Sequence, residues 1–324
     1  MNRTLRILLT GYALLAAAAL QAADTTAKPA AAAHRLAAPS PKAQAKAPAE
    51  PKLRPANLSV AQIVERNAAA RGGLEAWRKI NSMSMVGKMD AGRAREIRPE
   101  DYAPGHKRPL TGRGSDRDPG TMVQVPFVME FKRPRMSRVE INYRGQTAIQ
   151  VYDGVKGYKL RPFLNRSDWE SYGPEEMKAA ELQQELDGPL MNYLAKGTRI
   201  DVEGMAPIEG HDAFRLKLKF KNGQEERLWV DATSFLEVRI DGTRRVGGRE
   251  RPILTYLRDY KVVSGVKIPF LTSTQIEGRP DPEQIIASTV TINPDLNDSR
   301  FSPPQDAVLP KPTVQPKAVV PAKG

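Results

Sequence analysis

Apolar and basic side chains alternate over residues 214–220, the most regular pattern in this chain of 324 residues. The apolar members are Phe214, Leu216, Leu218 and Phe220. A period of two indicates a strand with one buried and one solvated face. Asn222-Gly223 follows, and this dipeptide favours the positive φ angles of a tight hairpin turn. Strand-like runs at 227–231 and 235–240 then predict a three-stranded antiparallel meander.

Similar runs on both sides of this meander predict more of the same sheet. Before it, we expect strands at 83–89, 123–131, 139–143, 147–152, 155–160 and 199–202. After it, we expect strands at 253–263, 266–276 and 285–292. The connections are short and several contain glycine, which is typical of antiparallel hairpins rather than of crossover helices. Pro126 lies within one run and predicts a sheet edge or a bulge there.

Two stretches have helical periodicity. Residues 60–80 predict two short helices, because Gly72-Gly73 interrupts the apolar pattern. Residues 175–196 begin with acidic side chains, as the helix dipole favours, and then repeat leucine at near-helical spacing. Gly188-Pro189 breaks this second helix into two pieces. The predicted fold class is therefore α+β: a curved antiparallel half-open β-barrel of about 11–12 strands with a helical lid over 175–196.

The ends of the chain differ in composition from this region. Residues 1–22 predict a secretory signal peptide, because their apolar run of about 14 residues is shorter than a membrane-spanning helix; an uncleaved anchor is the alternative. Residues 23–56 are rich in alanine, proline and lysine and predict a disordered tether, and 303–324 predict a disordered Pro-rich tail. The predicted folded domain is 57–302. Within it, 91–120 lacks apolar periodicity and predicts a mobile insertion.

The net charge and the absence of cysteine limit which compartment and which partners we expect. The net charge is +13, of which +5 lies in the predicted folded domain. Without cysteine, the chain has no disulfide, thiolate metal site or lipid-bearing N-terminal cysteine. We expect a soluble monomer in the periplasm. Its basic terminal segments either contact an anionic envelope surface or act as solubilising spacers, and nucleic acid is not an expected partner there.

Motifs of common catalytic sites are absent from the sequence. There is no Gly-x-Ser-x-Gly, no His-Glu-x-x-His and no glycine-rich nucleotide loop. His211 lies in a predicted turn without an acid or base partner and is interpreted as structural. Acidic residues within 91–120 match no metal-ligand spacing. We therefore predict no enzyme activity, no cofactor and no metal site.

Several short turn and strand motifs are spread along the predicted domain. They are Ala70-Arg71-Gly72-Gly73, Ala76-Trp77, Gly87-Lys88-Met89-Asp90, Tyr152-Asp153-Gly154, Gly210-His211-Asp212-Ala213, Trp229-Val230-Asp231 and Asp259-Tyr260-Lys261. Together with the order of elements, they resemble the LolA-like superfamily of periplasmic lipoprotein carriers, over most of residues 57–302. The resemblance implies an apolar cavity for lipid or lipoprotein acyl chains, in transport to the outer membrane. Because some relatives act as sensors, an envelope sensor or interaction module without transport activity is the alternative.

The cavity of such a carrier would be lined by apolar residues of the sheet and of the lid. The sheet candidates are Met83, Met85, Phe127, Met129, Phe131, Leu216 and Leu218, and the lid candidates are Met177, Leu186, Leu190 and Leu194. Methionine adapts its shape and suits contact with lipid. Ordinary core packing is the other interpretation of each residue. Trp229 points away from its neighbours Leu228 and Val230, and we expect it to pack under a helix.

Overall fold

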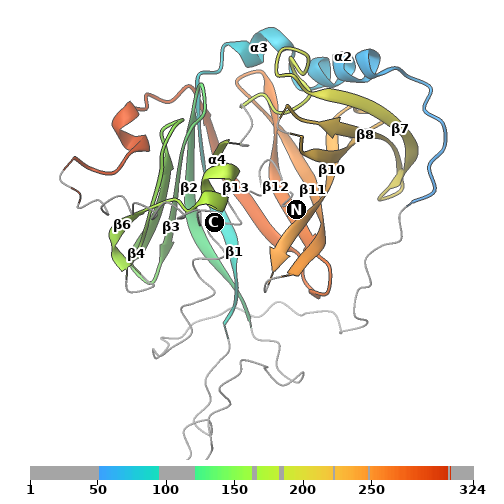
Figure 1. Ribbon diagram of the computed structural model, residues 1–324. Coiled ribbons are helices and arrows are strands. Elements are labelled where there is room, and N and C mark those ends of the chain that lie inside the picture. Colours follow the sequence, from blue (N-terminus) through green and yellow to red (C-terminus); the bar gives the residue numbers. More distant parts are fainter. Residues whose placement is uncertain are drawn as a thin grey trace, which may run out of the picture.

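A single antiparallel sheet forms the body of the protein. The computed structural model describes residues 51–94, 121–162, 166–181, 186–221, 223–246, 249–305 and 307. Within these residues, thirteen strands pair in the order β6-β5-β4-β3-β2-β1-β13-β12-β11-β10-β9-β8-β7 (Figure 1). Neighbours in the sheet are neighbours in the chain except at the β1–β13 ladder, which joins the two halves of the sequence. Strands β6 and β7 are the two edges, so the sheet is open.

The strands fall into two groups of sequential hairpins. The first comprises β1 (Ser82–Ala94), β2 (Thr121–Lys132), β3 (Met136–Tyr143), β4 (Gln146–Tyr152), β5 (Gly157–Arg161) and β6 (Arg166–Ser171). The second comprises β7 (Arg199–Ile208), β8 (His211–Lys219), β9 (Glu225–Asp231), β10 (Glu237–Val246), β11 (Arg249–Val263), β12 (Val266–Ile276) and β13 (Glu283–Ile292). The predicted antiparallel sheet is confirmed, and the predicted meander is β8–β10. β6 was not expected, because its sequence has no apolar alternation.

Pro126 lies in a strand with a neighbour on each side, but at Pro126 itself the strand is a local edge, one of the two predicted alternatives. β2 pairs with β1 on one side and with β3 on the other. The ladder with β3, however, runs from Phe127–Ile141 onwards and does not include Pro126. Because proline has no amide hydrogen to donate, it is tolerated at this end of the ladder.

Helix α2 (Val60–Ala70) begins with a capping box and ends at a glycine pair. The amide of Gln62 donates to Ser59 Oγ at 3.3 Å, and the amide of Ser59 donates to Gln62 Oε1 at 2.9 Å. Gly72 has φ +107°, and a Cβ there would lie 2.2 Å from the carbonyl oxygen of Gly265. Only glycine therefore fits where the chain turns from α2 to α3 (Leu74–Arg78) against the β11–β12 turn. This confirms the predicted helix break.

One face of the sheet carries the two largest of the three apolar clusters, and we call it the covered face. Cross-strand partners point to the same side of a sheet, so the register defines this face. It carries the pairs Met85–Met129, Phe127–Ile141, Ile253–Ile276, Leu218–Glu226 and Ile240–Leu228. Helices α2 and α3, at the top of Figure 1, pack apolar side chains against it.

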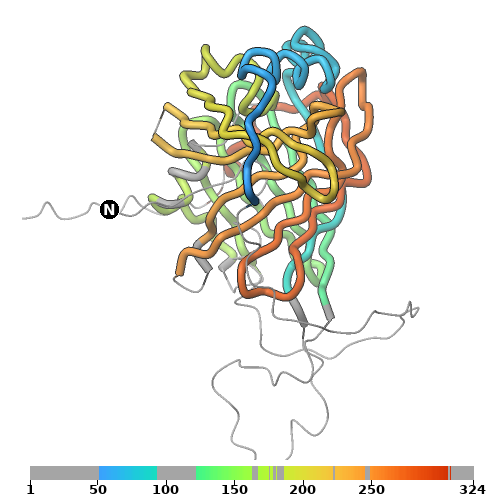
Figure 2. The backbone as a smooth tube through the Cα atoms, turned by 90° about the vertical axis from the view of Figure 1, so that its right-hand side faces the viewer, coloured from blue at the N-terminus to red at the C-terminus, as the bar shows by residue number. Residues whose placement is uncertain are grey.

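The N-terminal segment pairs with the edge strand β7 and packs Leu53 on the opposite face of the sheet. Arg54 exchanges two backbone hydrogen bonds of 2.8 Å with Met205, and Leu53 packs beside Ala206 and Trp229. The blue segment that crosses β7 and its neighbours in Figure 2 shows this placement. The predicted tether of 23–56 therefore ends too late, because residues 51–56 belong to the fold. Extended Pro-rich chain can still pair through its backbone, which composition does not show.

The structure differs from two further predictions, the start of the insertion and the helical region after β6. Residues 91–94, assigned to the mobile insertion, continue β1 and pair with β2. The remainder of that insertion, the signal peptide, the tether up to residue 50 and nearly all of the tail lie outside the described residues. The region predicted as a helical lid, 175–196, contains α4 (Pro174–Glu181) and then turns over 186–197 rather than a second helix, and a lid over the sheet is not confirmed.

Candidate functional site

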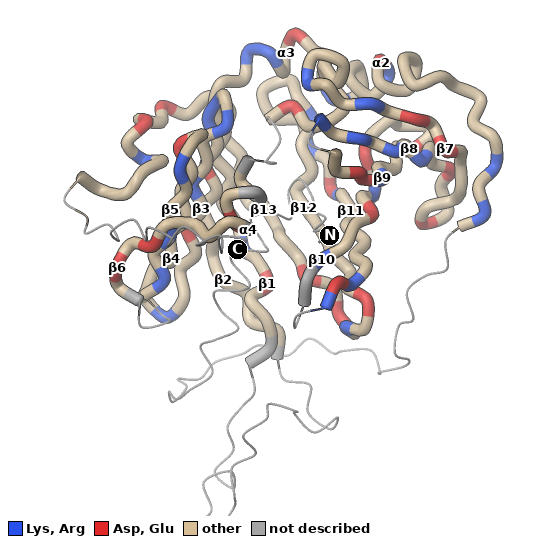
Figure 3. Tube along the Cα trace, viewed as in Figure 1, with Lys and Arg blue, Asp and Glu red and all other residues tan. Residues whose placement is uncertain are grey.

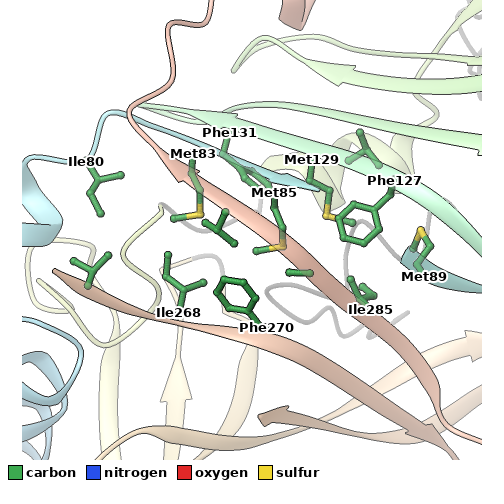
Figure 4. Packing of buried hydrophobic residues seen from close by; sticks show 14 of the residues in the cluster. Ile80, Met83, Met85, Met89, Phe127, Met129, Phe131, Ile268, Phe270 and Ile285 are labelled. Carbon is green, nitrogen blue, oxygen red and sulfur yellow. The ribbon is translucent and has the colours of Figure 1, made fainter. Parts of the chain in front are cut away.

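A cluster of methionine and phenylalanine side chains occupies the covered face of the central strands. It contains all five candidates predicted from the first half of the sheet: Met83, Met85, Phe127, Met129 and Phe131. Their exposed fractions range from 1 % to 9 %. Figure 4 shows these side chains pointing toward Ile268 and Phe270 of β12 and Ile285 of β13. We call this group, with Met89, the methionine cluster; its polarizable thioethers can follow the shape of whatever packs against them.

A second apolar cluster lies on the same face, over the strands of the other half. It contains Leu216 and Leu218 of β8 and Leu228 and Val230 of β9, with Ile63 of α2 packed against them. The two predicted sheet candidates of this half, Leu216 and Leu218, are both fully buried. The sequence thus correctly grouped residues by face within each strand. It could not show that the two groups form separate clusters.

Residues 186–197 bridge the two clusters. Leu186 and Met191 pack against the methionine cluster, whereas Leu190 and Tyr193 pack against the second one. Leu194 is 76 % exposed and joins neither, so its predicted place in the lid is wrong. Helical spacing placed it beside Leu190, but Gly188 and Asn192 have positive φ angles that turn the chain instead. We call residues 186–197 the cover segment.

Helix α4 contributes differently from the cover segment. Met177, its predicted lid residue, is half-buried and belongs to neither apolar cluster. The helix is attached by polar contacts: Lys159 Nζ of β5 donates to both carboxylate oxygens of Glu176, at 2.5 and 2.6 Å. Glu176 also accepts the amide of Gly173 at 2.7 Å, next to the start of the helix.

A buried polar network ties the cover segment to the rest of the fold. Arg71, just after α2, donates through Nη1 to the carbonyl of Asp187 at 2.8 Å and lies 3.3 Å from Glu237 Oε1. Lys196 Nζ donates to Asp187 Oδ1 at 2.5 Å. Tyr260 donates to the carbonyl of Glu237 at 2.9 Å. Burial, and then the negative charge of Glu237, raise the pKa of the Tyr260 phenol, so it remains a donor.

Polar side chains lie between and beyond the two apolar clusters on the covered face. Thr255 and Thr274 face each other with their hydroxyls 3.1 Å apart. Glu226 pairs in register with Leu218, and burial raises the pKa of its carboxyl to about 8. Arg244 of β10 reaches Glu283 of β13 across the two strands between them. The sequence pattern did not reveal these residues, because a charged residue within a strand pattern predicts a side chain that faces solvent.

Trp229 lies on the opposite face and is fully buried there, but not under a helix as predicted. The guanidinium carbons of Arg215 and Arg239 lie 5.6 and 4.6 Å from its ring centroid. Its indole Nε1 donates to Asp241 Oδ2 at 2.8 Å. Two arginines and a carboxylate therefore cover this ring, which is a structural arrangement.

Few charged residues lie on the two strands beside the methionine cluster. The described residues contain no group of three acidic or histidine side chains that could hold a metal ion. β12 and β13, which adjoin the methionine cluster, carry one charged residue each, and Figure 3 shows charge concentrated on other strands.

Of the helices in the described part of the chain, none has the length and hydropathy needed to cross a membrane.

Comparisons with known proteins place the fold. No protein-family model and no curated protein match the chain. Among solved structures, it is similar to a LolA superfamily protein from Nitrosomonas europaea, with 14 % identity and a TM-score of 0.48, over 76 % of this chain and 98 % of that one. It is also similar to a DUF1329 family protein from Desulfovibrio piger, with 12 % identity and a TM-score of 0.50, over 75 % and 97 %. The predicted resemblance is confirmed as structural similarity; at these identities it concerns the fold alone.

Proposed function

We propose that this protein is a periplasmic carrier that binds the hydrocarbon chains of a lipid or a lipidated protein on the covered face of its sheet. The sheet would be a half-open barrel with that face inside, and α4 and the cover segment would form its lid. Transfer would be toward the outer membrane, as in the carriers that the sequence resembles. Binding would be driven by removal of acyl chains from water, at about 0.8 kcal/mol per buried CH₂ group.

The observation that carries this proposal is the composition of the methionine cluster and of its cover. Four methionines and two phenylalanines gather on one face, and Met191 of the cover segment packs on them. Methionine-rich surfaces repack around ligands of different shape. The cover segment has turns instead of a regular helix, and it is held by the apolar contacts of Leu190 and Met191 and by the bond from Arg71 to Asp187. Its displacement would expose the cluster without disturbing a strand.

The contact between Arg244 and Glu283 supports a curved sheet. In a flat sheet, β10 and β13 would be three strand spacings apart, about 14 Å. Their side chains meet above β11 and β12, which is easier if the sheet bends toward the covered face. Curvature of this kind would bring the two apolar clusters toward each other.

The direct test is mass spectrometry of organic extracts from protein purified without detergent. We expect lipid or acyl-chain species at a stoichiometric level. Met85→Glu, which introduces a carboxylate into the methionine cluster, should abolish them, whereas Val262→Glu, at a position that is 66 % exposed, should not. Circular dichroism shows whether each variant is folded. Absence of lipid from the native protein, with no uptake on addition of lipid, would contradict carriage.

An envelope sensor or interaction module is the second candidate, and one observation favours it. The residues of the methionine cluster are already excluded from water by their own neighbours. A sensor would keep this packing permanently and use its outer surfaces for a protein partner. Affinity purification from envelope fractions would then recover a stable protein partner with a lipid-free protein.

A further inference from the structure

Arg244 has an unused hydrogen-bonding edge on the covered face. Its side chain is only 5 % exposed, and its Nη1 donates to Glu283 Oε2. Its Nε and Nη2 have no hydrogen-bond partner among the described residues. A buried donor without a partner carries an unfavourable desolvation cost, so two on one guanidinium call for an explanation.

The two free nitrogens belong to the same edge of the guanidinium. Nε–H and the neighbouring Nη2–H are parallel and form the fork with which arginine binds a carboxylate or a phosphate through two hydrogen bonds. A single carbonyl oxygen would have to be shared by the two N–H groups, which bends both hydrogen bonds. The geometry of the unused edge therefore selects for a planar or tetrahedral oxyanion.

The charges around this edge also favour an anion. Glu283 is shared between Arg244 and Arg279, whose Nη1 lies 2.6 Å from Oε1. Two positive groups thus face one carboxylate. Continuing the β9–β10 register places Glu226 opposite Gly242, two residues before Arg244 and on the same face. Burial keeps the carboxyl of Glu226 protonated at neutral pH, because it raises its pKa to about 8. These four side chains leave a net charge of about +1, since only one of the two carboxyls is ionised.

The edge lies close to apolar surface. Glu283 pairs with Thr274, and Ile285, two residues further along β13 on the same face, packs against the methionine cluster. Ile253, two residues from Thr255 on β11, belongs to the second cluster. An acyl chain lying on these clusters could therefore end at the guanidinium of Arg244.

We propose that Arg244 binds the anionic head group, a phosphate or carboxylate, of an amphiphile whose hydrocarbon chain lies on the methionine cluster. This inference rests on the proposed function and specifies its ligand: an anionic lipid in preference to a neutral one. Glu283 positions the guanidinium, and the neutral carboxyl of Glu226 avoids repulsion of the head group.

Binding of three ligands with one chain length tests the inference. Equilibrium dialysis of the purified protein would compare dodecyl phosphate, dodecanoate and dodecanol. We expect the two anions to bind at least about tenfold more tightly than the alcohol, as charge-assisted hydrogen bonds imply. In Arg244→Gln the affinity for the anions should fall to that for dodecanol, while dodecanol binding is unchanged. Glu283 keeps Arg279 as a partner in this variant.

Two further variants keep the test decisive. Arg279→Gln removes an arginine from the same carboxylate but leaves the edge of Arg244 intact, so the preference for anions should persist. Arg244→Lys keeps the charge but not the fork and should have an intermediate preference. Loss of the preference in Arg279→Gln to the same extent as in Arg244→Gln would overturn the assignment to Arg244.

The outcomes separate this inference from the proposed function. Equal affinity of the native protein for all three ligands would overturn the head-group site and leave hydrocarbon binding standing. Binding of none of them would overturn the proposed function and this inference together. Inorganic phosphate binding as tightly as dodecyl phosphate would show an anion site independent of any chain, which would also overturn the inference.

Discussion

The guanidinium of Arg71 lies over the ring of Trp77, 4.3 Å from its centroid, and the indole of Trp77 donates to the backbone carbonyl of Arg71 at 3.0 Å. The two residues thus fix each other at the junction of α2 and α3. The same guanidinium reaches Asp187 in the cover segment and Glu237 at the start of β10. A single arginine therefore connects the helices, the cover segment and the sheet.

Removing this arginine should be strongly destabilising. Arg71 and Glu237 are both more than 90 % buried, and loss of one partner leaves the other charge uncompensated. We expect Arg71→Met to lower the free energy of unfolding by about 3–5 kcal/mol in chemical denaturation. The double variant Arg71→Met/Glu237→Gln should recover part of this loss. Arg66→Met, a partly analogous change at a cation–π contact with Phe235, should have an effect below about 1 kcal/mol. Equal effects of the two single variants would contradict the role given to Arg71.

The turn after α2 should require glycine for steric reasons at its first position, Gly72, but not at Gly73. In Gly72→Ala, the new Cβ would meet the carbonyl oxygen of Gly265 at 2.2 Å, in addition to the strain of a positive φ. Gly73→Ala carries similar backbone strain, but its Cβ would meet no atom within 4 Å. We expect about 1–3 kcal/mol of destabilisation for Gly73→Ala and clearly more for Gly72→Ala. Thermal unfolding of both variants, side by side, measures the difference; equal melting temperatures would disprove the close approach.

Glu226 should make the stability of the protein depend on pH. Its pKa is about 8 in the folded chain against 4.5 in the unfolded chain, so the folded state holds the proton more tightly. The free energy of unfolding should then fall as pH rises between these two values, by up to about 1.4 kcal/mol per pH unit. Glu226→Gln removes this dependence, so its advantage over the native protein should grow between about pH 5 and about pH 8.5. Urea denaturation at the two pH values tests this, and a constant difference would refute it.

The cover segment should loosen before the sheet does. Lys196 Nζ donates to Asp187 and to the carbonyl of Gly188, at 2.5 and 2.8 Å. We expect Lys196→Met to increase amide hydrogen exchange within 186–197 severalfold, because Asp187 loses its shortest charged contact. Exchange in β1 and β2 should not change. Lys219→Met, which removes only a half-exposed contact at 4.0 Å, provides the control. Faster exchange throughout the sheet would show that the segment is part of the core and cannot act as a cover.

Alternation of apolar and charged residues was sufficient to find most strands. In β8, Arg215 and Lys217 separate the buried Phe214, Leu216 and Leu218, so both the strand and its inward face follow from the sequence. The β11–β12 hairpin was found equally well, since Ser264-Gly265 separates two long apolar runs. Such local patterns depend on neighbouring residues alone.

The lid shows where local patterns mislead. Leucines four residues apart predicted a helix through Leu194, but Asn192, with φ 53°, turns the chain and leaves Leu194 exposed. The spacing of leucines does not report the backbone angle of the residue between them. Contacts with both apolar clusters, rather than helix propensity, decide the path of this segment.

The polar part of the site was beyond prediction for a different reason. Arg244 and Glu283 are 39 residues apart, and their contact depends on the register of four strands. Glu226 occupies the inward register of β9, but as the second of two glutamates at a strand end it resembles a solvated residue. Only the assembled sheet shows which charged residues lie on the covered face.

Photolabelling with a fatty acid that carries a diazirine near its chain end tests the central claim most directly. After irradiation, peptide mass spectrometry locates the attachment sites. If the covered face binds hydrocarbon, labels should concentrate in 83–89 and 125–131 and in the cover segment, and unlabelled fatty acid should compete for them. Labels confined to the face around Trp229 or to the terminal segments, or labelling without competition, would contradict it.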